Sequence, residues 1–146
     1  MIAVDTNILV AFHRTDYTTH HRAKRAITEL AEGTAPWALP WPCLHEFLAV
    51  VTNRRIFKQP TPPEDAARVL DAVLESPVLR LLGEGPGYWD QLRSLVVAGV
   101  ITGPRVHDAR IAALCNQHRV SCLWTADRDF SRLPSLKTHN PLIEPA

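Results

Sequence analysis

The stretch IAVDTNILVAF, residues 2–12, decides the fold because three polar residues interrupt an apolar run. Residues 2–4 are typical of a buried strand, and residues 8–12 return apolar side chains as a core-packed helix requires. Asp5, Thr6 and Asn7 stand between them. A buried charge without a partner is costly to folding, so this interruption predicts either a turn that reaches solvent or a site that holds a ligand.

Short apolar strands alternate with helical patterns along the rest of the chain. We expect strands at 2–5, 37–41, 78–82 and 120–125, with a short edge strand at 140–145. We expect helices at 7–14, 20–33, 42–54, 62–76, 87–99 and 105–119. This alternation predicts the α/β class, with a mostly parallel sheet covered by helices on both faces. The length of 146 residues favours one domain over 1–146.

Composition excludes several classes of protein. The formal net charge of +1 argues against a non-specific polyanion binder, although it leaves local basic patches open. No apolar run approaches the roughly 20 residues that cross a bilayer, and no signal-peptide pattern opens the chain. The three cysteines lack zinc-binding spacing and suit reduced thiols. We therefore expect a cytoplasmic protein without membrane contact.

Polar residues follow the first and fourth predicted strands, where each strand ends. They are Asp5, Thr6, Asn7, Thr125, Asp127 and Asp129. Because ligands of open parallel sheets bind beyond the carboxyl ends of the strands, these side chains should share one rim. Two further carboxylates, Glu46 and Asp108, stand early in helices, beside the apolar stripe of each. Four separate segments thus bring carboxylates toward one edge of the sheet.

Each of these acids alone has an ordinary structural explanation, as a helix cap, a turn former or a solvated flank. Their convergence favours a cation. Two carboxylates about 4 Å apart repel by roughly 4 kcal/mol at an effective dielectric of about 20. Oxygen ligands without histidine or cysteine at ligand spacing indicate Mg²⁺, with Mn²⁺ as a substitute. Such a cation is suited to hydrolysing a phosphodiester.

The motifs VDTN (4–7), HEF (45–47), HDARIAA (107–113), TADRDF (125–130) and NPL (140–142) span nearly the whole chain. In this order they resemble those of PIN-domain ribonucleases, and in particular the VapC toxins of type II VapBC toxin–antitoxin systems. The resemblance implies a PIN-like three-layer α/β/α sandwich with strand order 3-2-1-4-5. It also implies a Mg²⁺-dependent endoribonuclease that forms a homodimer and is inhibited by a cognate VapB-type antitoxin.

The resemblance also implies roles for the acidic residues. Asp5 and Asp108 match the main metal ligands of the family, and Glu46 and Asp127 match its other two acidic positions. Whether Asp129 substitutes for Asp127 or supports it is open, as is the number of metal ions. We expect Asp127 to face the metal and Asp129 to cap the following turn.

Two polar residues match the positions that orient water or phosphate in the family, namely Asn7 and Thr125. Basic stretches at 20–25 and 53–58 could contact phosphates of an RNA, or could equally be solvated or meet the antitoxin. The helices at 20–33 and 42–54 are the candidates for an antitoxin groove.

Three other functions fit parts of the pattern. A haloacid-dehalogenase-like phosphatase would use Asp5 as nucleophile, but needs a second Asp where Asn7 stands. A metal-free ribonuclease would use two histidines, although His45 and His107 directly precede Glu46 and Asp108 and so point to other helix faces. A PIN-like module that only binds RNA or protein would leave the carboxylates without a catalytic role.

Overall fold

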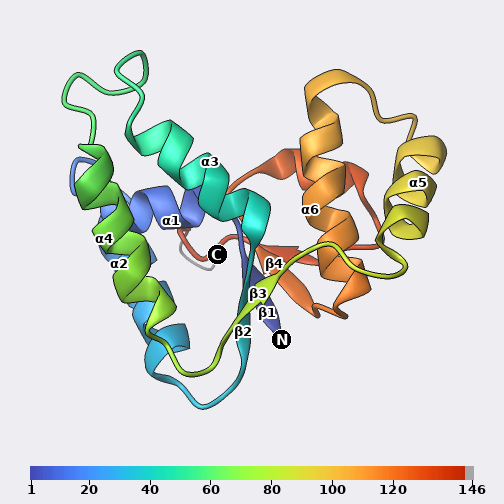
Figure 1. The fold of residues 1–146 in the computed structure, drawn as a ribbon, viewed down its shortest axis with the longest axis horizontal. Helices are drawn as coiled ribbons and strands as arrows, with labels where there is room; N and C mark the ends of the chain where they lie inside the picture. The colour runs from blue at the N-terminus through green and yellow to red at the C-terminus, as the bar shows by residue number, and fades with distance from the viewer. Residues whose placement is uncertain (144–146) are drawn as a thin grey trace.

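Five parallel strands form the sheet at the centre of the computed structural model, which describes residues 1–143 (Figure 1). Their order across the sheet is β3-β2-β1-β4-β5, and every neighbouring pair is parallel. The strands are β1 (Ile2–Val4), β2 (Trp37–Pro40), β3 (Leu79–Leu82), β4 (Cys122–Trp124) and β5 (Thr138–His139). The predicted strand order is confirmed.

The helices expected from the sequence are present, with boundaries that move by a few residues. They are α1 (Thr6–His13), α2 (His20–Glu32), α3 (Trp41–Val51), α4 (Pro63–Leu74), α5 (Tyr88–Ala98) and α6 (Val106–Gln117). Short 3₁₀ helices precede α6 and follow β4, as η1 (Gly103–Arg105) and η2 (Arg128–Arg132). Within residues 1–143, no helix is both long enough and apolar enough to cross a bilayer.

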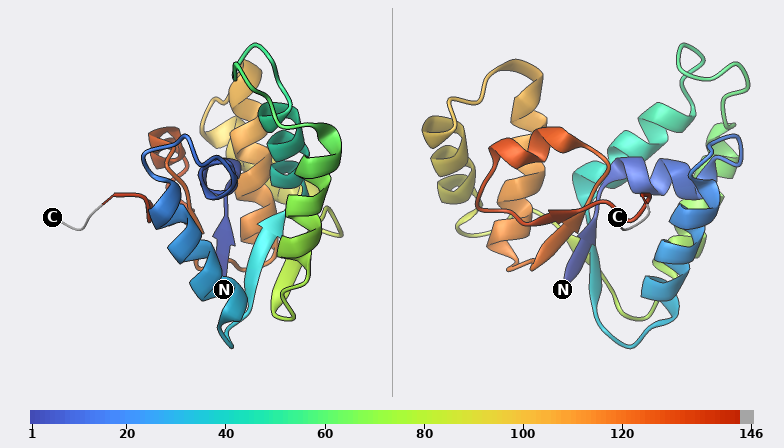
Figure 2. Two further views of the ribbon diagram at one scale, coloured as in Figure 1. Left: turned by 90° about the vertical axis from the view of Figure 1, so that its left-hand side faces the viewer. Right: turned by 180° about the vertical axis from the view of Figure 1, so that it is seen from behind.

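Alternating side chains on the strands create two separate cores, one on each face of the sheet. Val4 and Trp37 pack with α1, α2, α3 and α4 on one face, and their neighbours Ala3 and Ala38 pack with α6 and η2 on the other. Figure 2 shows these helical layers from two further directions. The alanines let α6 approach the sheet closely, where Ala112 packs into the same core. The three-layer sandwich is therefore confirmed.

The edge strand predicted at 140–145 was wrong. The last strand lies just before it, at Thr138–His139, and pairs with β4. The Asn140 side chain accepts a hydrogen bond from the Leu142 N–H at 2.9 Å, and this closes a turn that ends the strand. Leu142 then packs into the α1–α4 core, while residues 144 and 145 of the prediction lie outside the described residues.

Candidate active site

Asp5 joins the end of β1 to the start of α1 and to the end of β4. It is the N-cap of α1, and its Oδ1 accepts from the Thr6 N–H at 2.7 Å. Because Val4 pairs with Trp124, the next residues along each strand also lie side by side. The Thr125 hydroxyl accordingly donates to Asp5 Oδ2 at 2.7 Å. The carboxylate is thereby held at the carboxyl edge of the sheet, only 4% exposed.

The side-chain amide of Asn7 links Asp5 to the residues that follow β4. Its Nδ2 donates to Asp5 Oδ2 at 3.2 Å and to Thr125 Oγ1 at 3.1 Å, and its Oδ1 accepts from the Ala126 N–H at 2.9 Å. Thr125 Oγ1 also accepts from the Asp127 N–H at 3.0 Å. The loop after β4 therefore has a fixed position relative to α1, and Asp127 is fixed with it.

Glu46 reaches the same site from α3 although the residue is exposed to solvent. The hydroxyl of Thr6, itself 4% exposed, donates to Glu46 Oε2 at 3.0 Å. One turn earlier on α3, the buried Cys43 thiol donates to Asp5 Oδ1 at 3.6 Å. The sequence placed Thr6 on the rim without a role and indicated only a reduced thiol at Cys43, because neither contact has a signature in residue spacing.

The four predicted acids line one cleft with a volume of about 190 Å³. Its lining residues are Asp5, Thr6, Asn7, Val10, Tyr17, Glu46, Val50, Asp108 and Asp127. They come from the β1–α1 junction, the segment before α2, α3, α6 and the loop after β4. Within this described lining there is no lysine, arginine or histidine. Four carboxylates thus share one cavity without a cationic side chain among them.

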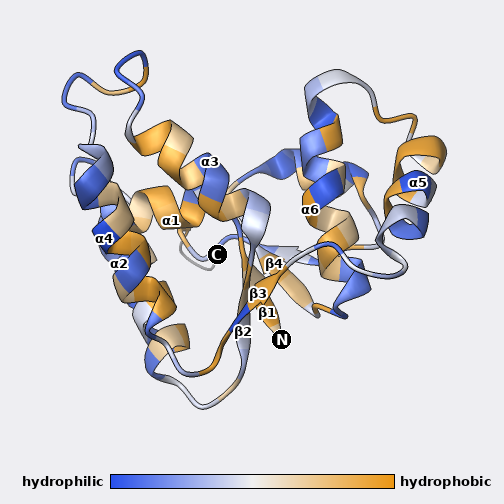
Figure 3. Cartoon of the chain, viewed as in Figure 1, coloured by the Kyte–Doolittle hydropathy of each residue, from blue (hydrophilic) through white to orange (hydrophobic). Residues whose placement is uncertain are grey.

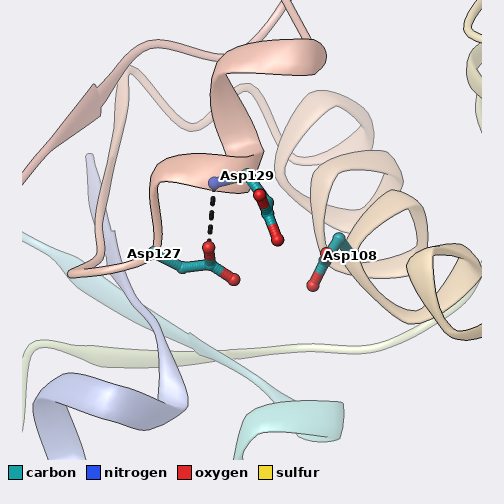
Figure 4. Close-up of side chains that lie close together, drawn as sticks. All are labelled: Asp108, Asp127 and Asp129. Carbon is teal, nitrogen blue, oxygen red and sulfur yellow. Dashed lines mark hydrogen bonds between the residues drawn. The ribbon is translucent and has the colours of Figure 1, made fainter.

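The tightest acidic group lies on one side of this cleft. Asp108, Asp127 and Asp129 each offer a carboxylate oxygen, and these oxygens all lie within 4.8 Å of one another. Figure 4 shows Asp127 just before η2 and Asp129 at its start, both facing Asp108 on α6. Asp5 and Glu46 line the same cleft but stand outside this group of three among residues 1–143.

The expectation that Asp129 caps the turn after β4 was wrong, because Asp127 is the cap. Asp127 Oδ1 accepts a hydrogen bond from the Asp129 N–H at 2.8 Å at the start of η2 (Figure 4). Asp127 also lines the cleft, whereas Asp129 is exposed and approaches Asp108 from outside the cleft lining. The geometry leaves both carboxylates within reach of a shared cation.

Burial and mutual repulsion raise the free energy of the ionised carboxylates. Burial raises the pKa of Asp5 from its ordinary value of 3.8 to about 6, against the hydrogen bond from Thr125, which lowers it. The pKa of Asp108 is also raised, first by burial and then by the charges of Asp127, Asp129 and Glu46. A positive charge in the cleft would relieve both effects.

The donor set fits Mg²⁺ or Mn²⁺. These cations prefer oxygen ligands, and Asp108, Asp127 and Asp129 offer carboxylate oxygens that lie within 4.8 Å of one another. The described lining of the cleft offers carboxylates, hydroxyls and an amide, and it lacks the histidine and cysteine ligands that are typical of zinc sites. The arrangement can therefore hold a hard divalent cation next to a polar wall formed by Asn7 and Thr125.

Comparison of the sequence with known proteins identifies related chains. The PIN domain profile matches residues 2–136. The VapC ribonuclease Mb2897 of Mycobacterium bovis is 37% identical over 142 residues, which cover 97% of this chain and 96% of the relative. Ribonuclease VapC25 of Mycobacterium tuberculosis is 32% identical over 143 residues, covering 98% and 100%.

Solved structures with the same fold include VapC20 of Mycobacterium tuberculosis, a toxin described as cleaving the sarcin-ricin loop. It superposes with a TM-score of 0.67 at 20% identity, over 91% of this chain and 95% of that one. VapBC2 of Rickettsia felis, bound to a promoter DNA fragment, gives a TM-score of 0.67 at 23% identity, over 96% and 98%. At these identities the likeness establishes the fold.

We expect Asp5 to make the stability of the metal-free protein depend on pH. Its pKa of about 6 in the folded protein exceeds the ordinary 3.8, so protonation favours the folded state. This contribution of up to about 3 kcal/mol is complete below pH 4 and is lost as the pH rises through 6. In EDTA, the melting temperature should fall between pH 5 and pH 7.5, and should fall less in Asp5→Asn.

Added Mg²⁺ should raise the melting temperature more at pH 7.5 than at pH 5, because protons compete for the carboxylates. Calorimetric melting of the parent and Asp5→Asn across this range measures both effects. An Asp5→Asn protein whose melting temperature follows that of the parent at every pH would contradict the assignment.

Proposed function

Because the chain belongs to the PIN-domain family, and within it to the VapC ribonucleases, we propose that its acidic cleft hydrolyses phosphodiester bonds in RNA as the toxin of a type II toxin–antitoxin system. The observation that carries this proposal is the convergence of Asp5, Glu46, Asp108 and Asp127 from four segments into one cleft. The residues 1–146 would act as a single PIN domain, in a cytoplasm that keeps its three unpaired cysteines reduced.

A divalent cation fits the centre of the mechanism. Asp108, Asp127 and Asp129 lie close enough together to share it, with Asp5 as a further ligand, and Glu46 lines the same cleft. Bound Mg²⁺, or Mn²⁺ in its place, would supply a more acidic water and offset negative charge on the reacting phosphate. The chain supplies the fixed frame in which that charge is held.

The neighbouring polar residues position the acids and the water. Thr125 and Asn7 both donate to Asp5 Oδ2, which directs the other carboxylate oxygen toward Thr6 N–H and Cys43. The hydroxyl of Thr6 restrains the otherwise flexible side chain of Glu46. Glu46 can then accept a proton from water at the open side of the cleft, as a general base does.

The alternative functions have less support. A phosphatase with Asp5 as nucleophile needs an acid two residues later, and Asn7 is instead engaged with Asp5, Thr125 and Ala126. Histidine catalysis lacks a candidate, because no histidine is among the described residues that line the cleft. A binding-only module gives no reason to gather four carboxylates where their charges repel.

A cognate VapB-type antitoxin is the proposed partner, and the solved VapBC2 complex supports a shared mode of assembly. Its inhibitory segment would lie against α2 and α3 and bring a lysine or arginine to the acidic cleft, where no cation is present in the described lining. A second copy of the chain is the other proposed partner. The peripheral helix α5 buries none of its residues and exposes Trp89 at 65% and Val97 at 63% (Figure 3).

Purified protein should cleave a structured RNA in Mg²⁺ or Mn²⁺ and not in EDTA. Asp108→Asn should lower the cleavage rate at least about 100-fold, a loss of about 2.7 kcal/mol in transition-state stabilisation, because it removes a ligand charge. Gel analysis of end-labelled RNA measures the rate. Cleavage that persists in EDTA would instead indicate histidine chemistry, and binding without cleavage would indicate an inert module.

Asp127→Asn should reduce cleavage at saturating Mg²⁺ by at least about 100-fold, and Asp129→Asn by less. Asparagine at 127 can still accept from the Asp129 N–H through its Oδ1, so the cap survives and the loss reports the missing charge. Asp129→Asn is the matched control, since it removes the same charge two residues away. A larger loss in Asp129→Asn would reverse the two roles.

The isolated chain should be a dimer by light scattering at micromolar concentration, and Trp89→Gln should shift it toward monomer because an exposed apolar side chain is lost. Trp41→Gln, which removes a tryptophan that is 41% exposed on another helix, is the matched control. A monomeric parent would remove the dimer proposal. A bound antitoxin that leaves the cleft around Asp5 open would remove the proposed inhibition by occlusion.

A further inference from the structure

The acidic cleft cannot attract RNA by itself. Its described lining carries four carboxylates and no cationic side chain, so the phosphates that flank the reacting one are repelled. A bound cation offsets this repulsion only near the reacting phosphate. The affinity for an RNA strand must therefore come from groups beside the cleft.

One wall of the cleft is apolar and includes an aromatic ring. Tyr17, Val10 and Val50 form this apolar part of the lining, with Val50 one turn after Glu46 on α3. The Tyr17 ring packs against Phe57, with 6.1 Å between ring centroids, and Phe57 is 7% exposed. The Arg14 guanidinium lies 4.0 Å from the centroid of the Phe57 ring. Phe57 thus supports the Tyr17 ring, and Tyr17 also lines the cleft.

Phe57 belongs to the segment that leaves the cleft wall after Val50, here called the 52–61 loop. This loop is held by its own backbone. The N–H groups of Ile56 and Phe57 donate to the Asn53 carbonyl, and the Arg55 N–H donates to the Asn53 side chain at 2.9 Å. Thr61 N–H closes the loop on the Val51 carbonyl at 2.7 Å. The loop backbone is therefore held in place, and Phe57 is the loop residue that contacts Tyr17.

The 52–61 loop carries three exposed cations, Arg54, Arg55 and Lys58. Within residues 1–143, no carboxylate forms an ion pair with these three cations of the loop. Exposed cations without partners close to an acidic catalytic cleft suit contact with a polyanion. A structural role would instead pair them with neighbouring acids.

We propose that Tyr17 and the 52–61 loop form the RNA-binding side of the cleft, with a nucleobase of a single-stranded segment against Tyr17 and adjacent phosphates on Arg54, Arg55 and Lys58. This rests on the proposed ribonuclease function and specifies how the substrate is held. An unpaired base can leave the stack and lie on an aromatic ring, whereas bases inside a duplex cannot. The cationic groups position the strand without reading its sequence.

The test separates binding from cleavage. Fluorescence anisotropy of a labelled 30-nucleotide single-stranded RNA of mixed sequence, measured in EDTA at several salt concentrations, reports affinity without chemistry. The loop variant carries Arg54→Gln, Arg55→Gln and Lys58→Gln. The control variant carries Arg80→Gln, Arg119→Gln and Lys137→Gln, which remove the same charge from exposed positions outside the loop and outside α5. Cleavage kinetics in Mg²⁺ are then measured with the same RNA.

The loop variant should bind at least about tenfold more weakly, and its slope of log affinity against log salt should fall by about 2, as expected for three lost phosphate contacts. Its KM should rise by a similar factor, with a much smaller change in kcat. The control variant should keep the affinity and salt slope of the parent within about twofold. Equal behaviour of the two triple variants would overturn the loop assignment.

Tyr17 is tested separately by Tyr17→Phe, which keeps the ring, and Tyr17→Leu, which removes it. We expect Phe to retain RNA affinity and Leu to lower it about tenfold with an unchanged salt slope. Equal affinity for both would overturn the stacking role. A loop variant that loses affinity for the antitoxin while keeping affinity for RNA would assign the loop to that partner and overturn the proposal. A parent that binds RNA through the loop without cleaving it would contradict only the proposed ribonuclease function.

Discussion

The Asp5 carboxylate, held between the Thr6 N–H and the Thr125 hydroxyl, is the contact on which the site depends. One oxygen accepts the hydrogen bond that caps α1, and the other accepts from Thr125, which holds the end of β4 next to β1. Asp5 therefore caps a helix, links two strands and lines the cleft at the same time. Because these demands meet at a position only 4% exposed, the carboxylate has little freedom to relax. Its geometry is set by the fold before any ligand arrives.

Hydrogen bonding and burial shift the pKa of Asp5 in opposite directions. The donors around Asp5 favour its ionised form, yet burial outweighs them and raises its pKa to about 6. Asp108 is subject to the same conflict, with Asp127 and Asp129 as close acidic neighbours. A protein under selection for stability alone would have little reason to keep these acids together. Their proximity is understandable as preparation for a cation, which replaces repulsion by attraction.

The strand order was predicted from the resemblance to PIN-domain ribonucleases, whereas the meeting of the four acids was predicted from parallel-sheet geometry. Carboxyl ends of neighbouring strands share an edge, so Asp5 and Thr125 had to approach once β1 paired with β4. The contacts of Thr6 with Glu46, and of Cys43 with Asp5, depend on how α3 packs, which residue spacing does not encode. Both positions suit an Asx turn, so the sequence pattern did not distinguish them. The prediction assigned the cap to Asp129, whereas in the structure Asp127 is the cap. The catalytic and metal-binding roles themselves stay predictions.

The net charge of +1 conceals a separation of charge that the tertiary structure creates. Acids from four segments collect in the cleft, while Arg54, Arg55 and Lys58, consecutive or nearly so in the chain, stand on the loop beside it. Phe57 links the two regions, since its ring anchors the loop and supports Tyr17 in the cleft wall. A polyanion can then be attracted at one position and brought to the acids at another, and a bound cation needs to neutralise only the phosphate that reacts.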